Sequence, residues 1–298
     1  MITERIIFLS DVHDCHIDWY GTKTADRMEK MVKDIAERQT DHPANLLIVM
    51  GDVSLDFWTW KEKGSYLRTP SVSNTDHFVR NYFRRLPQPA YMIPGNHEQY
   101  GGEKWMEITG CPRSYIIEGG NAVFVLLDNF AGNLDPTEHS DGTHTQTNCE
   151  MVKYVLEQYP DDLIFLCAHH FDPVSESEEF RELLAENDHI VALFQGHTHL
   201  SNVIPGSEAT GGKPILQCGN YSYTGVKGDP ADSFWGWREL EFDEDGTIRS
   251  FYHVPESHAR HGENEIRVEE HDQDEWEVCI PFDSEDEEYE YDFQEDEK

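Results

Sequence analysis

Five short groups of residues in this sequence carry side chains of the types that can bind metal ions. They are Asp11-Val12-His13, Gly51-Asp52, Gly95-Asn96-His97-Glu98, His169-His170 and Gly196-His197-Thr198-His199. Their carboxylate, amide and imidazole donors suit Zn, Fe, Mn or Co rather than a structural thiolate zinc site. The donors are too many for one tetrahedral ion. They predict a centre of two divalent metal ions about 3.5–4 Å apart, bridged by a carboxylate.

The elements that must position these groups are short apolar runs, which are typical of strands buried on both faces. Seven runs are expected as strands: Arg5–Ser10, Leu46–Met50, Ala90–Ile93, Val123–Leu127, Leu163–Ala168, Ile190–Phe194 and Pro214–Gln217. Each of the five groups lies at the end of one of these runs. Because α/β folds place their sites on the loops at strand ends, we expect the groups to converge.

Four segments with helical spacing of apolar residues lie between the strands. We expect helices around Met28–Ile35, capped by Thr24; around Phe78–Leu86, capped by Asn74 or Thr75 and stopped by Pro87; around Cys149–Tyr159; and around Phe180–Leu184. The alternation of strands and helices predicts the α/β class.

The order of the five groups, DxH, GD, GNHE, H and GHxH, resembles the pattern of the calcineurin-like metallophosphoesterase superfamily over about residues 5–200. The resemblance implies a four-layer αββα sandwich with a binuclear metal centre at its strand ends. It implies a ligand set in which Asp52 bridges the two ions, Asp11, His13 and His199 hold one, and Asn96, His169 and His197 hold the other. His97 would act beside the metals as an acid or as a stabiliser of the transition state.

Such a centre would clamp a phosphoryl group and lower the pKa of a bridging water, so that a hydroxide attacks phosphorus. His97 would protonate the departing oxygen. We therefore expect a dimetal-dependent hydrolase of phosphoric esters. A phosphodiesterase is preferred over a phosphomonoesterase of the same mechanism, because the GDxVDRG motif of protein phosphatases is replaced by Gly51-Asp52-Val53-Ser54-Leu55-Asp56. A non-catalytic metal-binding scaffold is the rival hypothesis from another class.

Some assignments stay open in the sequence. His169 is favoured over His170 as the ligand because it comes first after its strand. Asp56 either orients His97 or is an ordinary loop carboxylate. Loop aromatics either stack on a nucleobase or pack over the sheet; they are Trp19, Tyr20, Phe57, Trp58, Trp60 and Tyr66.

The net charge of the chain limits the classes of molecule that it can bind. The chain has 59 acidic and 23 basic residues and a net charge of −36, which repels nucleic acids and anionic lipids. We expect a small phosphorylated or nucleotide-like substrate, no nucleic acid and no membrane. No apolar run exceeds the six residues of Leu163–Ala168, and six scattered cysteines indicate a reduced, cytoplasmic protein. The sequence leaves the oligomeric state open.

The end of the chain differs from the rest in composition. Residues 262–298 include 18 acidic and two basic residues. We expect a catalytic domain over residues 1–260 and an acidic extension, partly mobile, over residues 261–298. Within the extension, Trp276, Val278, Ile280 and Phe282 alternate with polar residues, which predicts an edge strand.

Overall fold

Two six-stranded sheets form the centre of the computed structural model, which describes residues 1–16, 23–57, 59–60, 64–65, 73–132, 134, 141–222, 235–255 and 275–280. The first sheet has the order β14 (Trp276–Cys279), β13 (Thr247–His253), β12 (Trp237–Asp243), β1 (Ile2–Leu9), β2 (Leu46–Val49) and β5 (Ala90–Met92). The second has the order β10 (Val203–Ile204), β11 (Ile215–Gln217), β9 (Ile190–Gln195), β8 (Ile164–Ala168), β7 (Val123–Leu127) and β6 (Tyr115–Glu118). β3 (Thr59–Trp60) and β4 (Gly64–Ser65) pair separately.

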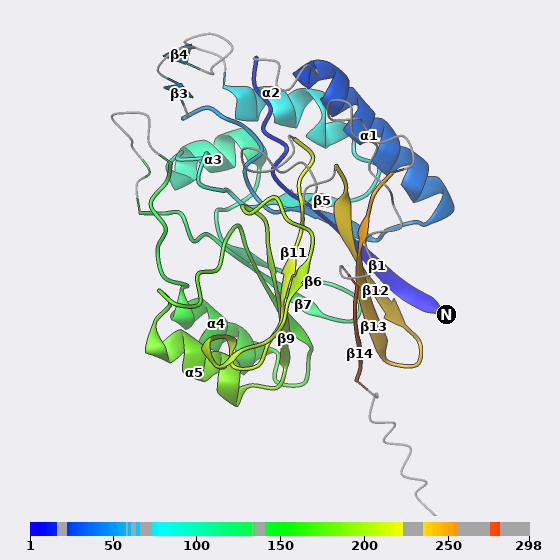
Figure 1. The fold of residues 1–298 in the computed structure, drawn as a ribbon, viewed down its shortest axis with the longest axis vertical. Coiled ribbons are helices and arrows are strands. Elements are labelled where there is room, and N and C mark those ends of the chain that lie inside the picture. Colours follow the sequence, from blue (N-terminus) through cyan, green and yellow to red (C-terminus); the bar gives the residue numbers. More distant parts are fainter. Residues whose placement is uncertain are drawn as a thin grey trace, which may run out of the picture.

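Helices cover the outer face of each sheet. α1 (Thr24–Asp41), α2 (Asn74–Asn81) and α3 (Gly102–Thr109) lie on the first sheet, and α4 (Cys149–Gln158) and α5 (Glu178–Glu186) lie on the second (Figure 1). Between the sheets, apolar side chains from both meet in one core, in which the rings of Phe8 and Phe194 stack 3.9 Å apart. The layers are therefore α, β, β and α, and the predicted four-layer sandwich is confirmed.

Each of the five groups follows a strand that belongs to a parallel part of its sheet. β1, β2 and β5 are parallel in the first sheet, and β7, β8 and β9 are parallel in the second. Parallel strands bring their carboxyl ends to one edge of a sheet. The loops after β1, β2, β5, β8 and β9 can therefore meet where these two edges lie together.

All seven predicted strands and three of the predicted helices are present, with small shifts at their ends. The helix predicted around Phe78–Leu86 is divided, because α2 ends at Asn81 and a short 3-10 helix, η1 (Phe83–Arg85), follows it. The predicted caps are wrong for two helices. Thr24 is the first residue of α1, whose N-cap residue Lys23 makes no side-chain hydrogen bond. The N-cap residue of α2 is Ser73, whose hydroxyl accepts a hydrogen bond from the backbone N–H of Asp76. The sequence also did not predict α3, β6, β10, β12 or β13.

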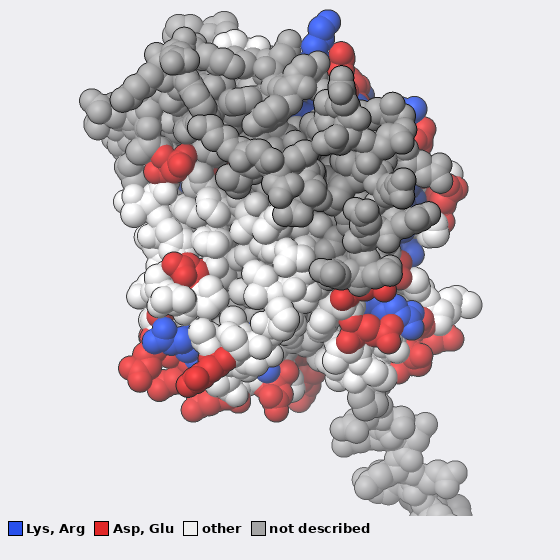
Figure 2. All heavy atoms as spheres, viewed as in Figure 1, with Lys and Arg blue, Asp and Glu red and all other residues white. Residues whose placement is uncertain are grey.

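The predicted edge strand is confirmed as β14, which pairs antiparallel with β13 at the end of the first sheet. Residues 281–298, which include Phe282 and the segment predicted to be mobile, lie outside the described residues. None of the helices in the described part of the chain combines the length and apolar composition needed to cross a bilayer. In Figure 2, acidic side chains gather at the lower end of the view, where α4 and α5 lie in Figure 1.

Candidate metal centre

The side chains of the five groups form one cluster at the carboxyl ends of β1, β2, β5, β8 and β9. Contacts of 2.9–3.9 Å between donor atoms connect all eight residues that the sequence singled out. These residues are Asp11, His13, Asp52, Asn96, His97, His169, His197 and His199. Residues almost 190 positions apart in the sequence therefore share one site.

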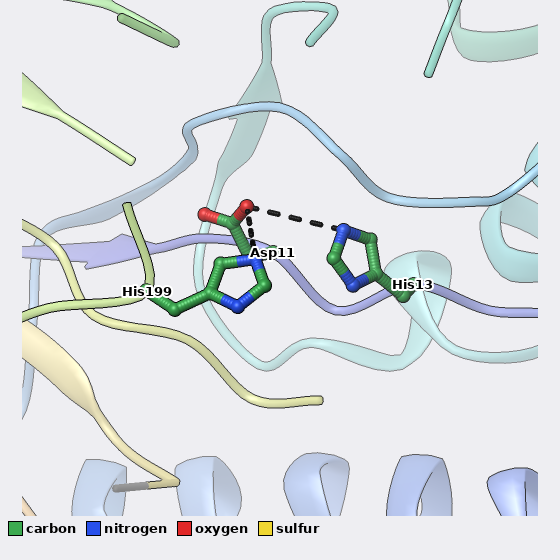
Figure 3. Close-up of side chains that lie close together, drawn as sticks. All are labelled: Asp11, His13 and His199. Carbon is green, nitrogen blue, oxygen red and sulfur yellow. Dashed lines mark ion pairs between the residues drawn. The ribbon is translucent and has the colours of Figure 1, made fainter. Parts of the chain in front are cut away.

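Asp11 lies between two imidazoles. Its Oδ1 atom is 3.2 Å from Nε2 of His199 and 3.9 Å from Nε2 of His13, as the dashed lines in Figure 3 show. The other oxygen, Oδ2, accepts hydrogen bonds from the hydroxyl of Ser10 and from the backbone N–H of His197. Oδ1 is buried and accepts no hydrogen bond from the described residues. Such an oxygen between two imidazole nitrogens suits a cation.

Asp52 stands at the middle of the cluster. Its Oδ2 atom is 3.2 Å from Nε2 of His169, 3.3 Å from Nε2 of His13 and 3.6 Å from Nε2 of His97. Its Oδ1 atom accepts a hydrogen bond of 3.1 Å from the backbone N–H of His97. One carboxylate therefore contacts imidazoles on both sides of the site.

The side chain of Asn96 lies between the imidazoles of two histidines. Its side-chain oxygen is 3.1 Å from Nε2 of His169 and 2.9 Å from Nδ1 of His197. The Nδ1 atom of His169 lies 2.7 Å from the carbonyl oxygen of Met50, a contact that fixes the ring with Nε2 turned into the cluster. His170 lies beside the cluster and not within it, since its ring packs against that of His197 with the centroids 4.7 Å apart.

The backbone is unusual at this site. The described residues contain five non-glycine residues with positive φ, and all belong to the cluster: Asp11 (51°), His13 (46°), Asp52 (50°), His197 (65°) and His199 (61°). Left-handed backbone is uncommon for non-glycine residues, although Asp and His adopt it more readily than most, and such residues cluster at active sites.

The glycines of the motifs allow close approach. A Cβ atom at Gly95 would collide with the carboxylate of Asp52, and one at Gly196 would collide with the hydroxyl of Ser10. Gly51, at φ +95°, would place a Cβ 2.6 Å from Nδ1 of His169. Glycine precedes the Asp, Asn and His residues because no larger residue fits there.

The buried carboxylates remain ionised in this environment. Burial opposes ionisation of Asp11, but His199 holds its pKa at about 2. Burial likewise opposes ionisation of Asp52, and His169 and His97 lower its pKa well below the usual value. Burial lowers the pKa of His13 to about 4, so that its ring is neutral at pH 7. Anionic carboxylates and a neutral imidazole are the forms that bind metal ions.

Three sets of side chains could each hold an ion, with one ligand atom per residue and all of these atoms within 4.8 Å of one another. They are Asp11, His13 and His199; His13, Asp52 and His97; and Asp52, His169 and His197. The sets overlap at His13 and Asp52, as expected where neighbouring ions share ligands. The residues present thus fit a pair of cations, and these donors leave the choice among Mn, Fe, Zn and Co open.

Asp56 does not contact His97. It accepts hydrogen bonds from the backbone N–H groups of Asn74 and Thr75, at 2.6 and 3.0 Å, and also binds the hydroxyls of Ser73 and Tyr100. Of the two hypotheses for Asp56, the structure supports an ordinary loop carboxylate, here one that holds the N-terminus of α2.

Two residues near the cluster were missed by the sequence analysis. The Oδ1 atom of Asp141 is 3.5 Å from Nδ1 of His97. Arg27 of α1 is buried and donates hydrogen bonds to the carbonyl oxygens of Val12 and His13. Neither residue belongs to a motif, and only the tertiary fold brings them to the site.

Most of the loop aromatics lie outside the described residues. This is so for Trp19, Tyr20, Trp58 and Tyr66, and the side chain of Trp60 is not described either. Phe57 packs edge-to-face against Tyr100, with the ring centroids 4.8 Å apart.

Known proteins resemble this chain over the region that contains the cluster. The family model for calcineurin-like phosphoesterases matches residues 4–201, a range that includes all eight residues of the cluster. A probable cyclic nucleotide phosphodiesterase of Synechococcus sp. is 25% identical over 280 residues, which cover 87% of this chain and 96% of that protein. One of Pseudoalteromonas sp. is 24% identical over 64% of this chain and 70% of that protein. A dimetal phosphatase from Danio rerio has a similar fold (TM-score 0.57, 11% identity), covering 87% of this chain and 98% of that one.

Proposed function

We propose that this chain, which belongs to the calcineurin-like phosphoesterase family as its motif order predicted, hydrolyses small nucleotide-like phosphodiesters. Its class is that of a metal-dependent phosphoesterase. The observation that carries the proposal is the cluster around Oδ2 of Asp52, which three imidazole Nε2 atoms approach within 3.6 Å. The names of the two bacterial relatives support a phosphodiester as the substrate.

In this proposal, Asp52 would be shared between two divalent cations. Asp11, His13 and His199 would hold one of them, and Asn96, His169 and His197 would hold the other. When bound, the cations supply a water of lowered pKa and neutralise charge on the phosphoryl group. The chain's own contribution is to fix these donors in a buried site, where electrostatic interactions are stronger than in water.

His97 is proposed as the catalytic acid. Its backbone N–H is bonded to Oδ1 of Asp52, and its Nε2 atom lies 3.6 Å from Oδ2 of the same residue. The ring therefore faces the cluster from outside the two proposed triads. From there it can donate a proton to the departing oxygen as the phosphorus–oxygen bond breaks.

The preference for a diester over a monoester rests on two observations. The two bacterial relatives are named as probable cyclic nucleotide phosphodiesterases, and the GDxVDRG motif of protein phosphatases is absent at Gly51–Asp56. A phosphomonoesterase with the same residues is the second candidate, and a metal-binding scaffold without turnover is the third.

Hydrolysis assays with purified protein separate these candidates. We would load the protein with Mn, Fe, Zn or Co in turn and offer bis(4-nitrophenyl) phosphate, 4-nitrophenyl phosphate, 3′,5′-cyclic nucleotides and a short oligonucleotide. We expect diester turnover that exceeds monoester turnover and is lost in Asp52→Asn and His97→Ala. Turnover no higher than in these two variants would contradict the proposal and leave the scaffold. Cleavage of the oligonucleotide would contradict the expectation of a small substrate. These assays do not test the cytoplasmic location, which stays a prediction.

A further inference from the structure

The imidazole of His97 has a carboxylate on each side. Nε2 is 3.6 Å from Oδ2 of Asp52, and Nδ1 is 3.5 Å from Oδ1 of Asp141. A histidine that transfers a proton through one nitrogen needs its other nitrogen held, because otherwise the ring can rotate or adopt the wrong tautomer. Asp56 cannot hold it, since both of its oxygens bind the start of α2.

The backbone beside Asp141 is fixed to the same motif as His97. The N–H of Gly142 donates a 2.7 Å hydrogen bond to the carbonyl oxygen of Asn96, the residue before His97. A Cβ atom at Gly142 would lie only 3.0 Å from that oxygen, so glycine permits this close approach. The position of Asp141 relative to His97 is thus set by a neighbouring backbone contact and not by its side chain alone.

We propose that Asp141 is the positioning residue of His97: its Oδ1 atom, which lies at ion-pair distance from Nδ1, accepts a hydrogen bond from Nδ1–H during the reaction, so that Nε2 faces the scissile ester. This inference rests on the proposed function. In the imidazolium form, Nε2–H passes its proton to the leaving oxygen, which keeps the electron pair of the broken phosphorus–oxygen bond. The ring is left neutral with its proton on Nδ1, still directed at Asp141. The side chain of Asp141 is 59% exposed, so its effect is on orientation more than on charge, which water screens.

A double-mutant cycle tests this role. We would measure kcat and KM for Asp141→Ala, His97→Ala and the double variant with two diesters that differ only in their leaving group, 4-nitrophenol or phenol. Asp141→Ala should lower kcat about tenfold with little change in KM. The loss should be larger for the phenyl ester, because phenoxide needs the proton more. In the His97→Ala background, Asp141→Ala should change kcat less than about twofold.

Two further variants show whether the carboxylate itself matters. Asp141→Glu should recover most of the lost rate, because an exposed and longer side chain can still reach Nδ1. Asp172→Asn removes the same charge from the neighbouring loop after β8 and should leave the rate unchanged. Equal losses from Asp141→Ala in both backgrounds, or a loss that Asp141→Glu does not recover, would overturn the proposal.

A measurement that does not depend on turnover separates this inference from the proposed function. In zinc-loaded protein labelled with 15N-histidine, the ring nitrogens of His97 should show a protonated Nδ1 that is lost in Asp141→Ala. An unchanged spectrum would overturn the role of Asp141 even if the enzyme hydrolyses diesters. Absence of turnover by the unsubstituted protein would instead contradict the proposed function, while the spectrum would still decide the role of Asp141.

Discussion

The two proposed triads of the centre differ in charge and exposure. The first triad (Asp11, His13 and His199) has a carboxylate of its own, whereas the second triad (Asn96, His169 and His197) has only amide and imidazole donors. Two members of each triad are buried, Asp11 and His13 in the first and Asn96 and His169 in the second, so exposure differs only at the third member: His199 is half-buried and His197 is exposed. A cation is attracted more strongly by a negative charge that water does not screen. We infer that the first triad holds its cation more tightly and that the second exchanges more readily.

The supports behind the two triads also differ. The loop of the first triad receives hydrogen bonds from the Arg27 guanidinium at the carbonyls of Val12 and His13, and from the backbone N–H of Tyr221 at the carbonyl of Asp11. In the second triad, the ring of Phe130 packs against the rings of His169 and His197, with centroids 5.5 and 5.7 Å apart. Hydrogen bonds also hold the second triad, from the N–H of Gly142 to the carbonyl of Asn96 and between Nδ1 of His169 and the carbonyl of Met50. What sets the first triad apart is therefore the buried guanidinium of Arg27 behind its loop.

Removal of the shared carboxylate should abolish the function of both triads. Asp52→Asn should lower kcat/KM for diesters by more than about 10³-fold, beyond the loss of one electrostatic donor. The bound metal should fall from two ions per chain to less than one, measured by elemental analysis after dialysis. Asp188→Asn, at an exposed position, is the control. Two retained ions in Asp52→Asn would show that Asp52 does not bridge them.

Replacing the carboxylate of Asp11 by an amide, or the amide of Asn96 by a carboxylate, should reduce the difference in cation affinity between the two triads. Asp11→Asn should weaken the tighter cation by at least about a thousandfold, since two unit charges about 4 Å apart already interact by about 4 kcal/mol in a partly screened site and this cation is divalent. Asn96→Asp should act in the opposite sense and strengthen the weaker cation. Competition with a chromophoric chelator measures both constants. If Asn96→Asp left the weaker constant unchanged, charge would not be the reason for the difference.

The sequence predicted the donors of both triads but not their supports. The donors follow apolar strands, and the structure brings them together at the strand ends as their types and spacing predicted. Their division between two ions came from the family resemblance and stays a prediction. Arg27 and Asp141 lie in a helix and a loop without a motif, and their contacts with Val12 and His97 form only when the chain folds.

The strand β12 was missed for a related reason. Its Arg238, Glu239 and Glu241 are buried, although charged residues at such positions usually indicate an exposed segment. Glu241 accepts a hydrogen bond from Arg5 of β1, and Glu239 accepts two of 2.8 Å from Arg38 of α1. These partners are distant in the sequence, so a pattern of neighbouring residues could not reveal that the charges are paired.

The pH should affect the two triads differently. Burial opposes protonation of His169, but the charge of Asp52 outweighs it and raises the pKa to about 9, whereas the pKa of Asp11 is about 2 and that of His13 about 4. Below pH 9 the second cation must displace a proton from His169, so its affinity should rise with pH by up to about tenfold per unit. Asp11 and His13 add no such slope above pH 5. Zinc titrations at pH 6, 7 and 8 that gave equal slopes for both ions would contradict this difference.

Added methyl groups should disturb the two triads to different degrees. Gly51→Ala presses on Nδ1 of His169 beside the shared Asp52 and should weaken the second cation more than the first, whereas Gly196→Ala presses on Ser10 and Asp11 beside His197 and should weaken the first cation more than the second. Each should lower the free energy of unfolding by about 1–3 kcal/mol. Gly102→Ala, where a Cβ meets nothing within 4 Å, is the matched control and should be neutral or slightly stabilising. Thermal unfolding with and without metal measures these effects, and equal weakening of both ions by either variant would speak against separate triads.

The smallest expected effect tests the support of the first triad. Arg27→Lys keeps the buried positive charge but loses the fork that reaches the carbonyls of Val12 and His13 together. The loop then holds Asp11 and His13 less firmly in their left-handed backbone, and the affinity of the first cation should fall about tenfold while the second changes little. Arg85→Lys, a half-exposed arginine paired with Glu29, is the control and should leave both affinities unchanged. If Arg27→Lys weakened the second cation as much as the first, Arg27 would not be a support specific to the first triad.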